Sequence, residues 1–221
     1  MDKPVQFLFT DLETDGTKPN EGNQILEVSC ILTDNKLNQI GKPFHSLVCP
    51  RFLHQTIDNF TPFIRNMHTE NGLIKDLLKL AETDEMLRTQ EEKFRVNNVE
   101  REILNWLNDL WPEGSPMAEI RMAGHSINSL DLPFIRVWMP ELAGNLSHRT
   151  LDISSYVRFI TDSCEIPNSD IPFGLKKAGH RAQDDNMMAI TEAKKLREWI
   201  ITANHLMKKA GLNNFFKNID E

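Results

Sequence analysis

Residues 5–16 read VQFLFTDLETDG, an apolar run that ends abruptly in acidic residues and a glycine. The first six residues favour a strand, whereas the acidic stretch that follows, which continues through Gly16 to Pro19, is typical of a loop. We therefore predict a strand over residues 5–10 that passes into a loop. Because side chains alternate along a strand, residues two apart point to the same face, so Asp11 and Glu13 are expected to converge at one edge of a sheet.

Further strand patterns follow this loop. Residues 25–33 (ILEVSCILT) are rich in β-branched side chains, a turn is marked at Asp34, and residues 43–49 (PFHSLVC) can pair alongside. These three segments predict an antiparallel meander. Residues 120–123 predict another strand, and residues 151–156 a strand or turn that leads into a helix.

Helical periodicity dominates the remainder. Apolar residues recur at helical spacing over residues 72–81 and 99–110, and Pro112 ends the second segment. A further helix is expected at about 132–138, with Pro133 in its first turn and Pro140 closing it. The clearest pattern covers residues 184–206. Strands followed by helices that alternate with short strands predict an α/β fold with a mixed sheet flanked by helices. With neither a repeat nor a linker, we expect one domain over residues 1–212 and a flexible tail at 213–221.

The composition is that of a soluble enzyme-sized protein. The chain has 221 residues, of which 40% are hydrophobic and 26% charged, which argues against a disordered, collagen-like or coiled-coil protein. No apolar run approaches the roughly 20 residues of a membrane helix, and the first residues, with a short apolar stretch and several acids, are not expected to form a signal peptide. We expect a cytoplasmic protein without a membrane partner.

Cysteine count and charge limit the function classes further. Cys30, Cys49 and Cys164 lack the pairing of a zinc site or a disulfide framework and are expected to be buried thiols. The net charge is 25 minus 32, or −7. The surface as a whole therefore cannot hold a long nucleic acid, and any polyanion must be bound locally.

Other acidic residues lie at predicted helix starts. Asp131 follows the turn in GHSINSLD, and Asp184 and Asp185 follow His180 in GHRAQDD. Each has a structural explanation, Asp131 as an N-cap and the later pair as partners of the helix dipole, just as Asp11 could belong to a solvated turn. A loop His near a helix-start Asp also suits a general base beside a metal ion.

Together these three segments resemble the motifs of the DEDDh 3′–5′ exonucleases. The DLET-DG segment from Asp11, the GHSxxxxD segment ending at Asp131, and HRAQDD from His180 occur in the family's order, and the likeness extends from Phe7 to about Trp199. MPEL at 139–142 and RTLDIS at 149–154, together with a His ahead of GL at 72–73, are most similar to oligoribonucleases. The resemblance implies a ribonuclease H-like fold.

The resemblance also implies the catalytic set. Asp11, Glu13, Asp131 and Asp185 would hold two divalent ions, Mg²⁺ or Mn²⁺, and His180 would deprotonate the attacking water. Two ions in such a site can stabilise both the attacking and the leaving oxygen at phosphorus, and they offset the repulsion between carboxylates and phosphate. An acidic protein can in this way cleave nucleic acid.

The substrate-binding residues implied by the resemblance are Phe63, His68, Ser126, Arg149 and Ser154. Phe63 would stack on a base, His68 would contact the 3′ nucleotide, and the other three would hold the 5′ phosphate. Core packing for Phe63, a surface ion pair for Arg149 and turn positions for the serines are alternative interpretations.

The sequence departs from the oligoribonuclease pattern at two positions. Thr17 stands where a Leu is usual, which weakens an apolar wedge between bases, and His125 stands where an Asn is usual. One extra residue lies between Ser126 and Asp131. A short basic cluster of Lys176, Lys177 and Arg181 could guide phosphates inward or form a solvated loop.

These observations predict a metal-dependent 3′–5′ exonuclease that degrades short single-stranded RNA, and also DNA, to nucleoside 5′-monophosphates. The resemblance implies a homodimer. The alternatives are a DNA proofreading or trimming exonuclease of the same superfamily, and an inactive module that binds nucleic acid or protein.

Overall fold

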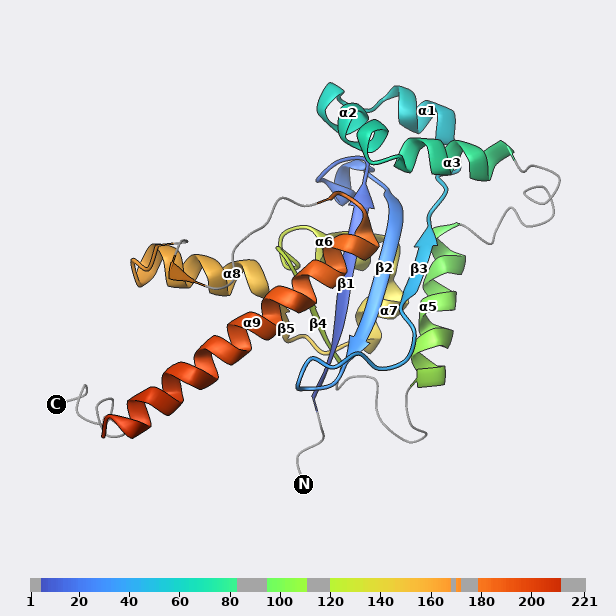
Figure 1. The fold of residues 1–221 in the computed structure, drawn as a ribbon. Helices are drawn as coiled ribbons and strands as arrows, with labels where there is room; N and C mark the ends of the chain where they lie inside the picture. Colours follow the sequence, from blue (N-terminus) through green and yellow to red (C-terminus); the bar gives the residue numbers. More distant parts are fainter. Residues whose placement is uncertain (1–4, 83–94, 111–119, 168–169, 172–178, 212–221) are drawn as a thin grey trace.

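A mixed five-stranded sheet forms the centre of the computed structural model, which describes residues 5–82, 95–110, 120–167, 170–171 and 179–211 (Figure 1). The strand order is β3-β2-β1-β4-β5. The strands are β1 (Gln6–Thr14), β2 (Ile25–Thr33), β3 (Phe44–Leu47), β4 (Ile120–Gly124) and β5 (Thr150–Asp152). The first three form the predicted antiparallel meander, and β4 and β5 extend it with parallel pairing. The predicted α/β architecture is confirmed.

Strand β1 is longer than the sequence pattern predicts. It continues to Thr14 instead of ending at Thr10, because Asp11 and Glu13 remain in the ladder opposite Ser29 and Glu27 of β2. Pairing with β2 satisfies the backbone groups of the acidic segment, which a loop would leave to solvent. Asp11 and Glu13 are therefore held by the sheet itself.

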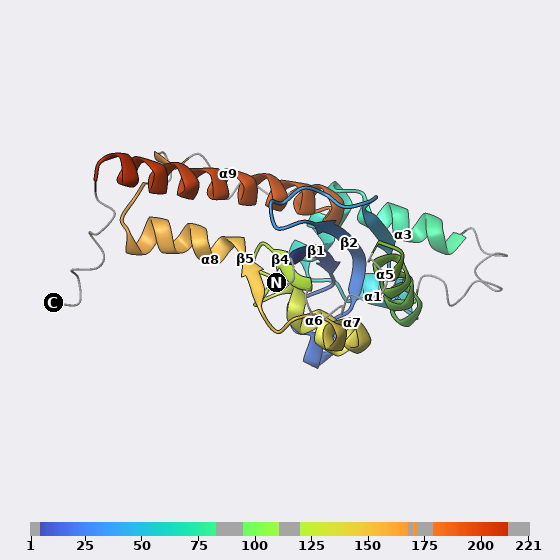
Figure 2. The same cartoon turned by 90° about the horizontal axis from the view of Figure 1, so that it is seen from below.

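Helices cover both faces of the sheet, as Figures 1 and 2 show. Leu8 packs in the core under α5 (Val96–Leu110), α6 (Asp131–Trp138) and α7 (Pro140–Asn145), whereas its neighbour Phe9 packs in the core under α8 (Ile153–Arg158) and α9 (Ala182–Lys209). By strand alternation, Asp11 and Glu13 share the face of Phe9 and thus point toward α9.

Three helices lie beyond the end of β1 at which the acidic residues are found (Figure 1). They are α1 (Leu53–Asp58), α2 (Pro62–Glu70) and α3 (Leu73–Glu82), and they enclose a separate apolar cluster that includes Leu26 and Phe60. The helical pattern at 72–81 predicts α3, but α1 and α2 were not expected. Thr61 caps α2 by accepting a hydrogen bond from Ile64 N–H, and Pro62 is the first residue of the helix. A Thr followed by a Pro is a helix-start signal that is visible in the sequence.

Most other helix boundaries differ by a few residues from those predicted by the apolar periodicity of the sequence. Helix α5 begins three residues earlier than expected, α9 begins two residues earlier, and α7 uses Pro140 as its first residue, although we expected that proline only to close the preceding helix. Short turns of other helix types occupy Pro19–Glu21 and Phe159–Ser163. The predicted tail at 213–221 and the stop at Pro112 lie outside the described residues.

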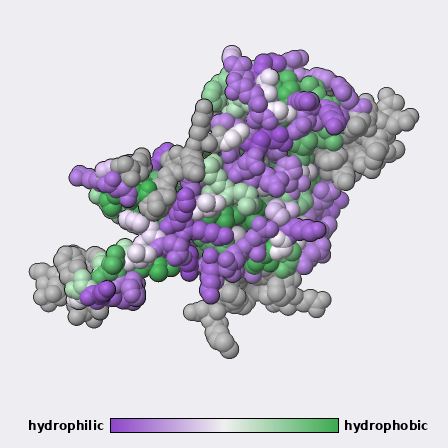
Figure 3. Space-filling view, viewed as in Figure 1, coloured by the Kyte–Doolittle hydropathy of each residue, from purple (hydrophilic) through white to green (hydrophobic). Residues whose placement is uncertain are grey.

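The exposure of polar residues and the burial of two of the three cysteines agree with the sequence-based expectations. Hydrophilic residues cover most of the described face in Figure 3. Cys30 and Cys49 are buried as expected, but Cys164 is exposed, because it follows the last helical turn of Phe159–Ser163 rather than packing beneath it. Of the helices in the described ranges, none combines the length and hydropathy of a membrane span.

Candidate active site

A cleft of about 410 Å³ opens where β1, α6 and the start of α9 meet. The four carboxylates of the sequence motifs line it together with the predicted base; they are Asp11, Glu13, Asp131, Asp185 and His180. A larger cleft of about 680 Å³, lined by Arg51, Arg95 and Trp138 among others, contains none of these groups. The structure therefore brings the five motif residues into one cleft.

The two acids of β1 are strongly perturbed. Glu13 is 5% exposed, and burial, together with the charges of Glu27 and Asp185, raises its pKa to about 8. Burial raises the pKa of Asp11 well above its usual value, and the charges of Asp131 and Glu13 add to that effect. Carboxyl groups packed this closely resist ionisation unless cations offset their charge.

Asp131 reaches the cleft from the first residue of α6. Its Oδ1 accepts a hydrogen bond from Leu12 N–H at 2.9 Å, and burial raises its pKa to about 8. The helix N-cap is Leu130, and Asp131 does not cap the helix, so the capping interpretation of Asp131 is wrong. The side chain instead crosses to β1 and ties α6 to the strand that carries Asp11.

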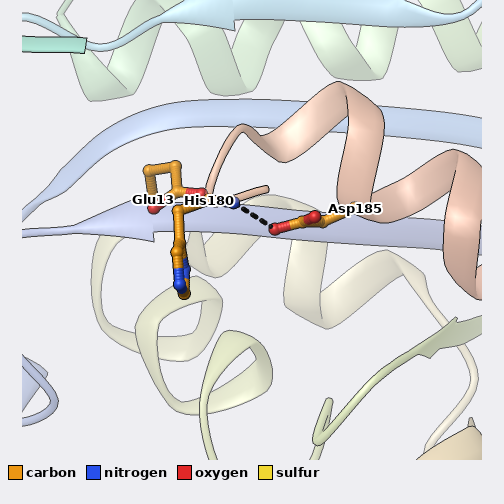
Figure 4. Close-up of side chains that lie close together, drawn as sticks. All are labelled: Glu13, His180 and Asp185. Atoms are coloured by element: carbon orange, nitrogen blue, oxygen red, sulfur yellow. Dashed lines mark hydrogen bonds between the residues drawn. The ribbon is translucent and has the colours of Figure 1, made fainter. Parts of the chain in front are cut away.

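Asp185 and His180 come together at the start of α9 (Figure 4). The Asp185 carboxylate accepts hydrogen bonds from Gly179 N–H at 2.8 Å and from His180 N–H at 3.0 Å. His180 has a left-handed backbone with φ of 54°, and its carbonyl accepts a hydrogen bond from the Asn71 side chain. Asp184 is exposed and lies outside the lining of the cleft.

The donor set fits a divalent cation. Ligand atoms of Glu13, His180 and Asp185 lie within 4.8 Å of one another. Asp11 and Asp131 add further carboxylate oxygens to the same cleft, and hard ions such as Mg²⁺ and Mn²⁺ prefer oxygen ligands. Burial and neighbouring acids raise the pKa values of Glu13 and Asp131 and so disfavour their charged forms, which a bound cation would stabilise.

Arg181 does not guide phosphates, contrary to one interpretation of the sequence. Its guanidinium lies 2.8 Å from Glu27 Oε1 and 2.9 Å from Asp76 Oδ2, and the Ala182 N–H also donates to Glu27. Burial raises the pKa of Glu27, but hydrogen bonds from His45 and Arg181 outweigh it and set the pKa at about 2. Lys176 and Lys177 lie outside the described residues.

Phe63 and His68, the two residues expected to contact the nucleotides of the substrate, have different environments. Phe63 is 73% exposed and lines the cleft, so core packing does not explain it. His68 is fully buried outside the cleft lining, and its Nε2 donates to Thr14 O at 2.9 Å. Its Nδ1 is 3.9 Å from Glu13 Oε2, so His68 supports the acid-bearing end of β1.

Of the three residues expected to hold a phosphate, the structure brings two together. Ser126 lines the cleft, and its backbone N–H donates to Ser154 Oγ at 3.2 Å. Ser154 itself is buried. Arg149 is exposed, and it is not among the residues that line the cleft.

Two groups near the site were not predicted from sequence. Glu27 stands in the middle of a buried strand, and a charged residue inside the apolar run ILEVSCILT is a signal that could have identified it. His125 lines the cleft and lies 2.9 Å from the buried Glu192 of α9. Glu192 falls on the core face of its helix, which is again an unusual place for an acid.

Sequence comparisons connect this geometry with known proteins. A family model described as Exonuclease matches residues 8–193. An oligoribonuclease of Acinetobacter baylyi is 30% identical over 204 residues, which cover 90% of this chain and 97% of the relative. An Arabidopsis thaliana oligoribonuclease is 28% identical over 197 residues, covering 89% of this chain and 79% of the relative. A human mitochondrial oligoribonuclease is 25% identical over 207 residues, covering 92% and 74%.

Solved structures agree with the fold. Escherichia coli exonuclease I in complex with a dT13 oligonucleotide superposes with a TM-score of 0.55 at 18% identity, covering 89% of this chain and 41% of that chain. A structure of an apo exonuclease I also gives a TM-score of 0.55. The chain thus spans about two fifths of these exonuclease I chains, and the likeness supports the expected ribonuclease H-like fold.

Proposed function

This chain belongs to the exonuclease family, and from that premise we propose that it is an oligoribonuclease-like 3′–5′ exonuclease that releases nucleoside 5′-monophosphates from short single-stranded oligonucleotides. One observation carries the proposal. Four carboxylates from β1, α6 and α9 line a single cleft together with His180, although they are far apart along the chain. A set of acids around one cavity is suited to phosphodiester hydrolysis with metal ions.

Two ions, Mg²⁺ or Mn²⁺, would be held by Asp11, Glu13, Asp131 and Asp185. When bound, such ions stabilise negative charge on the oxygens at phosphorus. The protein's own contribution is to fix the carboxylates before the ions arrive. Asp11 and Glu13 are held by the sheet, Asp131 by Leu12 N–H, and Asp185 by two backbone N–H groups.

His180 is proposed as the general base that takes a proton from the attacking water. Its side chain lines the cleft beside Glu13 and Asp185, as general-base catalysis requires. Its backbone is fixed on both sides, by the bond to Asp185 and by Asn71. The neighbouring Arg181, paired with Glu27, anchors the same segment to the sheet.

The likeness to oligoribonucleases supports a short substrate, and the cleft offers groups that could bind it. The cleft has a volume of about 410 Å³, and Phe63 offers an exposed ring at its wall for a base to stack on. Thr17 also lines the cleft, in the place of the apolar wedge that oligoribonucleases usually have. Ser126 is proposed to receive the 5′ phosphate, with Ser154 holding it in place and Arg149 adding charge nearby. His68 is proposed to support the 3′ nucleotide indirectly, through Thr14 and Glu13.

Assembly and location are further proposals. Large apolar side chains are exposed on α8, on the turn after it and on α9, among them Tyr156, Phe159 and Ile200, and a surface of this kind supports a homodimer. Sedimentation equilibrium tests this proposal, and a monomer at micromolar concentration would reject it. The cytoplasmic location expected from the sequence stays a prediction.

A time course with 5′-labelled RNA and DNA oligonucleotides of increasing length, in Mg²⁺ and in Mn²⁺, tests the proposal. We expect stepwise shortening from the 3′ end, with short RNA cleaved fastest, and no cleavage by Asp11→Asn. Faster degradation of long single-stranded DNA would favour the DNA-trimming alternative. Cleavage of neither polymer by folded protein would favour a binding module.

A further inference from the structure

A line of four side chains connects the interior of α9 with the wall of the cleft. Glu192 Oε2 lies 2.9 Å from His125 Nε2, and His125 Nδ1 lies 3.2 Å from Ser154 Oγ. Ser154 Oγ is in turn 3.4 Å from Ser126 Oγ. Glu192 is 2% exposed, whereas His125 and Ser126 both line the cleft. Neither His125 nor Glu192 belongs to the catalytic set.

The contacts in this line set how each side chain is held. The Glu192 carboxylate lies 2.9 Å from Nε2 of the His125 ring and fixes the orientation of that ring. The other ring nitrogen, Nδ1, then faces the Ser154 hydroxyl at hydrogen-bond distance. The Ser154 oxygen remains available as an acceptor for Ser126 N–H, 3.2 Å away. Glu192 thus holds the ring of His125 in place, and His125 in turn holds the hydroxyl of Ser154.

The end of the line is a strained residue. Ser126 has a φ of 52°, in the left-handed region that is unfavourable for residues other than glycine. Such a conformation persists only where the surroundings hold it. The hydrogen bond from Ser126 N–H to Ser154 Oγ provides that restraint. The place of the Ser126 hydroxyl on the cleft wall therefore depends, through Ser154, on His125.

We propose that His125, oriented by Glu192, is a positioning residue for the part of the cleft that receives the terminal phosphate of the substrate. This inference rests on the function proposed above. The Ser126 hydroxyl on the cleft wall is a suitable donor for a phosphate oxygen, provided that its position is fixed before the ligand binds, and Ser154 holds it there. His125 acts through Ser154 and has no part in the metal chemistry.

Paired dinucleotides that differ only in the presence of a 5′ phosphate test this role. Binding is measured by calorimetry with Ca²⁺ in place of Mg²⁺, so that turnover does not interfere. We expect His125→Ala to weaken binding of the phosphorylated dinucleotide roughly tenfold, as for a hydrogen bond to a charged group. Binding of the unphosphorylated dinucleotide should stay within about twofold of wild type. His54→Ala, at an exposed His of α1, is the matched control.

A double-mutant cycle separates positioning from general damage. If His125 acts through Ser154, the variant His125→Ala/Ser154→Ala should bind the phosphorylated dinucleotide no more weakly than Ser154→Ala alone. His125→Asn, whose amide keeps a partner for Ser154, should restore most of the phosphate preference. Glu192→Gln should lose part of it, and it serves as the test if His125→Ala does not fold. Equal weakening of both dinucleotides, or additive losses, would overturn the proposal.

The proposed exonuclease activity and the proposed role of His125 are measured by separate experiments on the same protein. Nucleotide release by wild type in Mg²⁺ tests the exonuclease activity, whereas the ratio of the two binding constants tests the role of His125. Absence of release together with a phosphate preference that His125→Ala removes would reject the activity and support the positioning role. Release together with an unchanged preference in His125→Ala would reject the positioning role alone.

Discussion

Glu13 and Glu27 stand opposite each other in the β1–β2 pair, and their pKa values move in opposite directions, to about 8 and about 2. Both are buried, so burial alone does not distinguish them. The difference is the set of partners, because Glu27 pairs with Arg181 and is hydrogen-bonded to His45, whereas Glu13 faces Asp185 and the other acids of the cleft. The sheet thus contains one acid that is satisfied by the protein and one that is left for a cation.

Removing the charge of Glu27 should destabilise the fold. Glu27→Gln leaves Arg181 without its buried partner, which costs on the order of 3 kcal/mol. Chemical denaturation in the presence of a chelator measures the loss. The control is Glu21→Gln, which breaks an exposed ion pair with Lys18 and should change stability by less than about 1 kcal/mol. Similar effects of the two substitutions would contradict the anchoring role of Glu27.

Asp11→Asn should abolish cleavage and stabilise the metal-free protein. The substitution removes a carboxyl group whose ionisation is opposed by burial and by neighbouring acids, so the melting temperature in chelator above pH 8 should rise by several degrees while activity is lost. Asp184→Asn, at the exposed neighbour of Asp185, is the matched control and should leave both quantities near wild type. A lower melting temperature for Asp11→Asn in chelator would argue against repulsion at this site.

Stability of the metal-free protein should fall as the pH rises from about 5 to 8. In the native state Glu13 and Asp131 retain protons up to a pKa of about 8, whereas the unfolded chain releases them near 4.5 and 3.8. The native state therefore binds more protons in this window, and stability decreases with pH. Thermal melting in chelator across this range measures the slope, which saturating Mn²⁺ should flatten. A rise in stability with pH in chelator would be inconsistent with the raised pKa values.

His180→Ala should lower turnover while leaving metal affinity within a few fold of wild type. Loss of a general base typically reduces the rate by about 10²- to 10⁴-fold. Single-turnover kinetics and calorimetric Mn²⁺ titration measure the two effects separately, with His54→Ala as a control. An unchanged rate would remove the assignment of His180 as the base.

Phe63→Ala should raise KM for short oligonucleotides more than it lowers kcat. Stacking of a base on an aromatic ring contributes about 1–3 kcal/mol, which corresponds to a KM increase of roughly 5- to 150-fold. The control is Phe52→Ala, because Phe52 is also largely exposed but lies outside the catalytic cleft. Equal effects of the two substitutions would exclude a specific stacking role.

The sequence predicts the sheet better than it predicts the helices beyond it. Residues 25–33 form β2 with the expected bounds, since alternating and β-branched residues mark buried strands directly. The end of β1 was misplaced, because the acidic residues after Thr10 resemble a loop until the ladder with β2 is known. Short helices such as α1 give too few turns for a periodic signal.

The order of the sequence motifs identifies the carboxylates of the site. The residues that hold these carboxylates in place make tertiary contacts, which the motifs do not predict. Arg181 and Glu27, like His125 and Glu192, are more than 60 positions apart in the sequence. Neither contact can therefore be predicted from local sequence patterns. The same holds for His68, whose ring donates to the backbone of Thr14 rather than facing the cleft. Such contacts follow from the packing of helices against the sheet, which local sequence patterns do not encode.

A calorimetric titration of the chelator-treated protein with Mn²⁺ tests the central claim most directly. The account predicts two ions per chain, with binding lost or reduced to one ion in Asp185→Asn and retained in Asp184→Asn. Wild-type protein that binds no Mn²⁺, or binding that Asp185→Asn leaves unchanged, would contradict it.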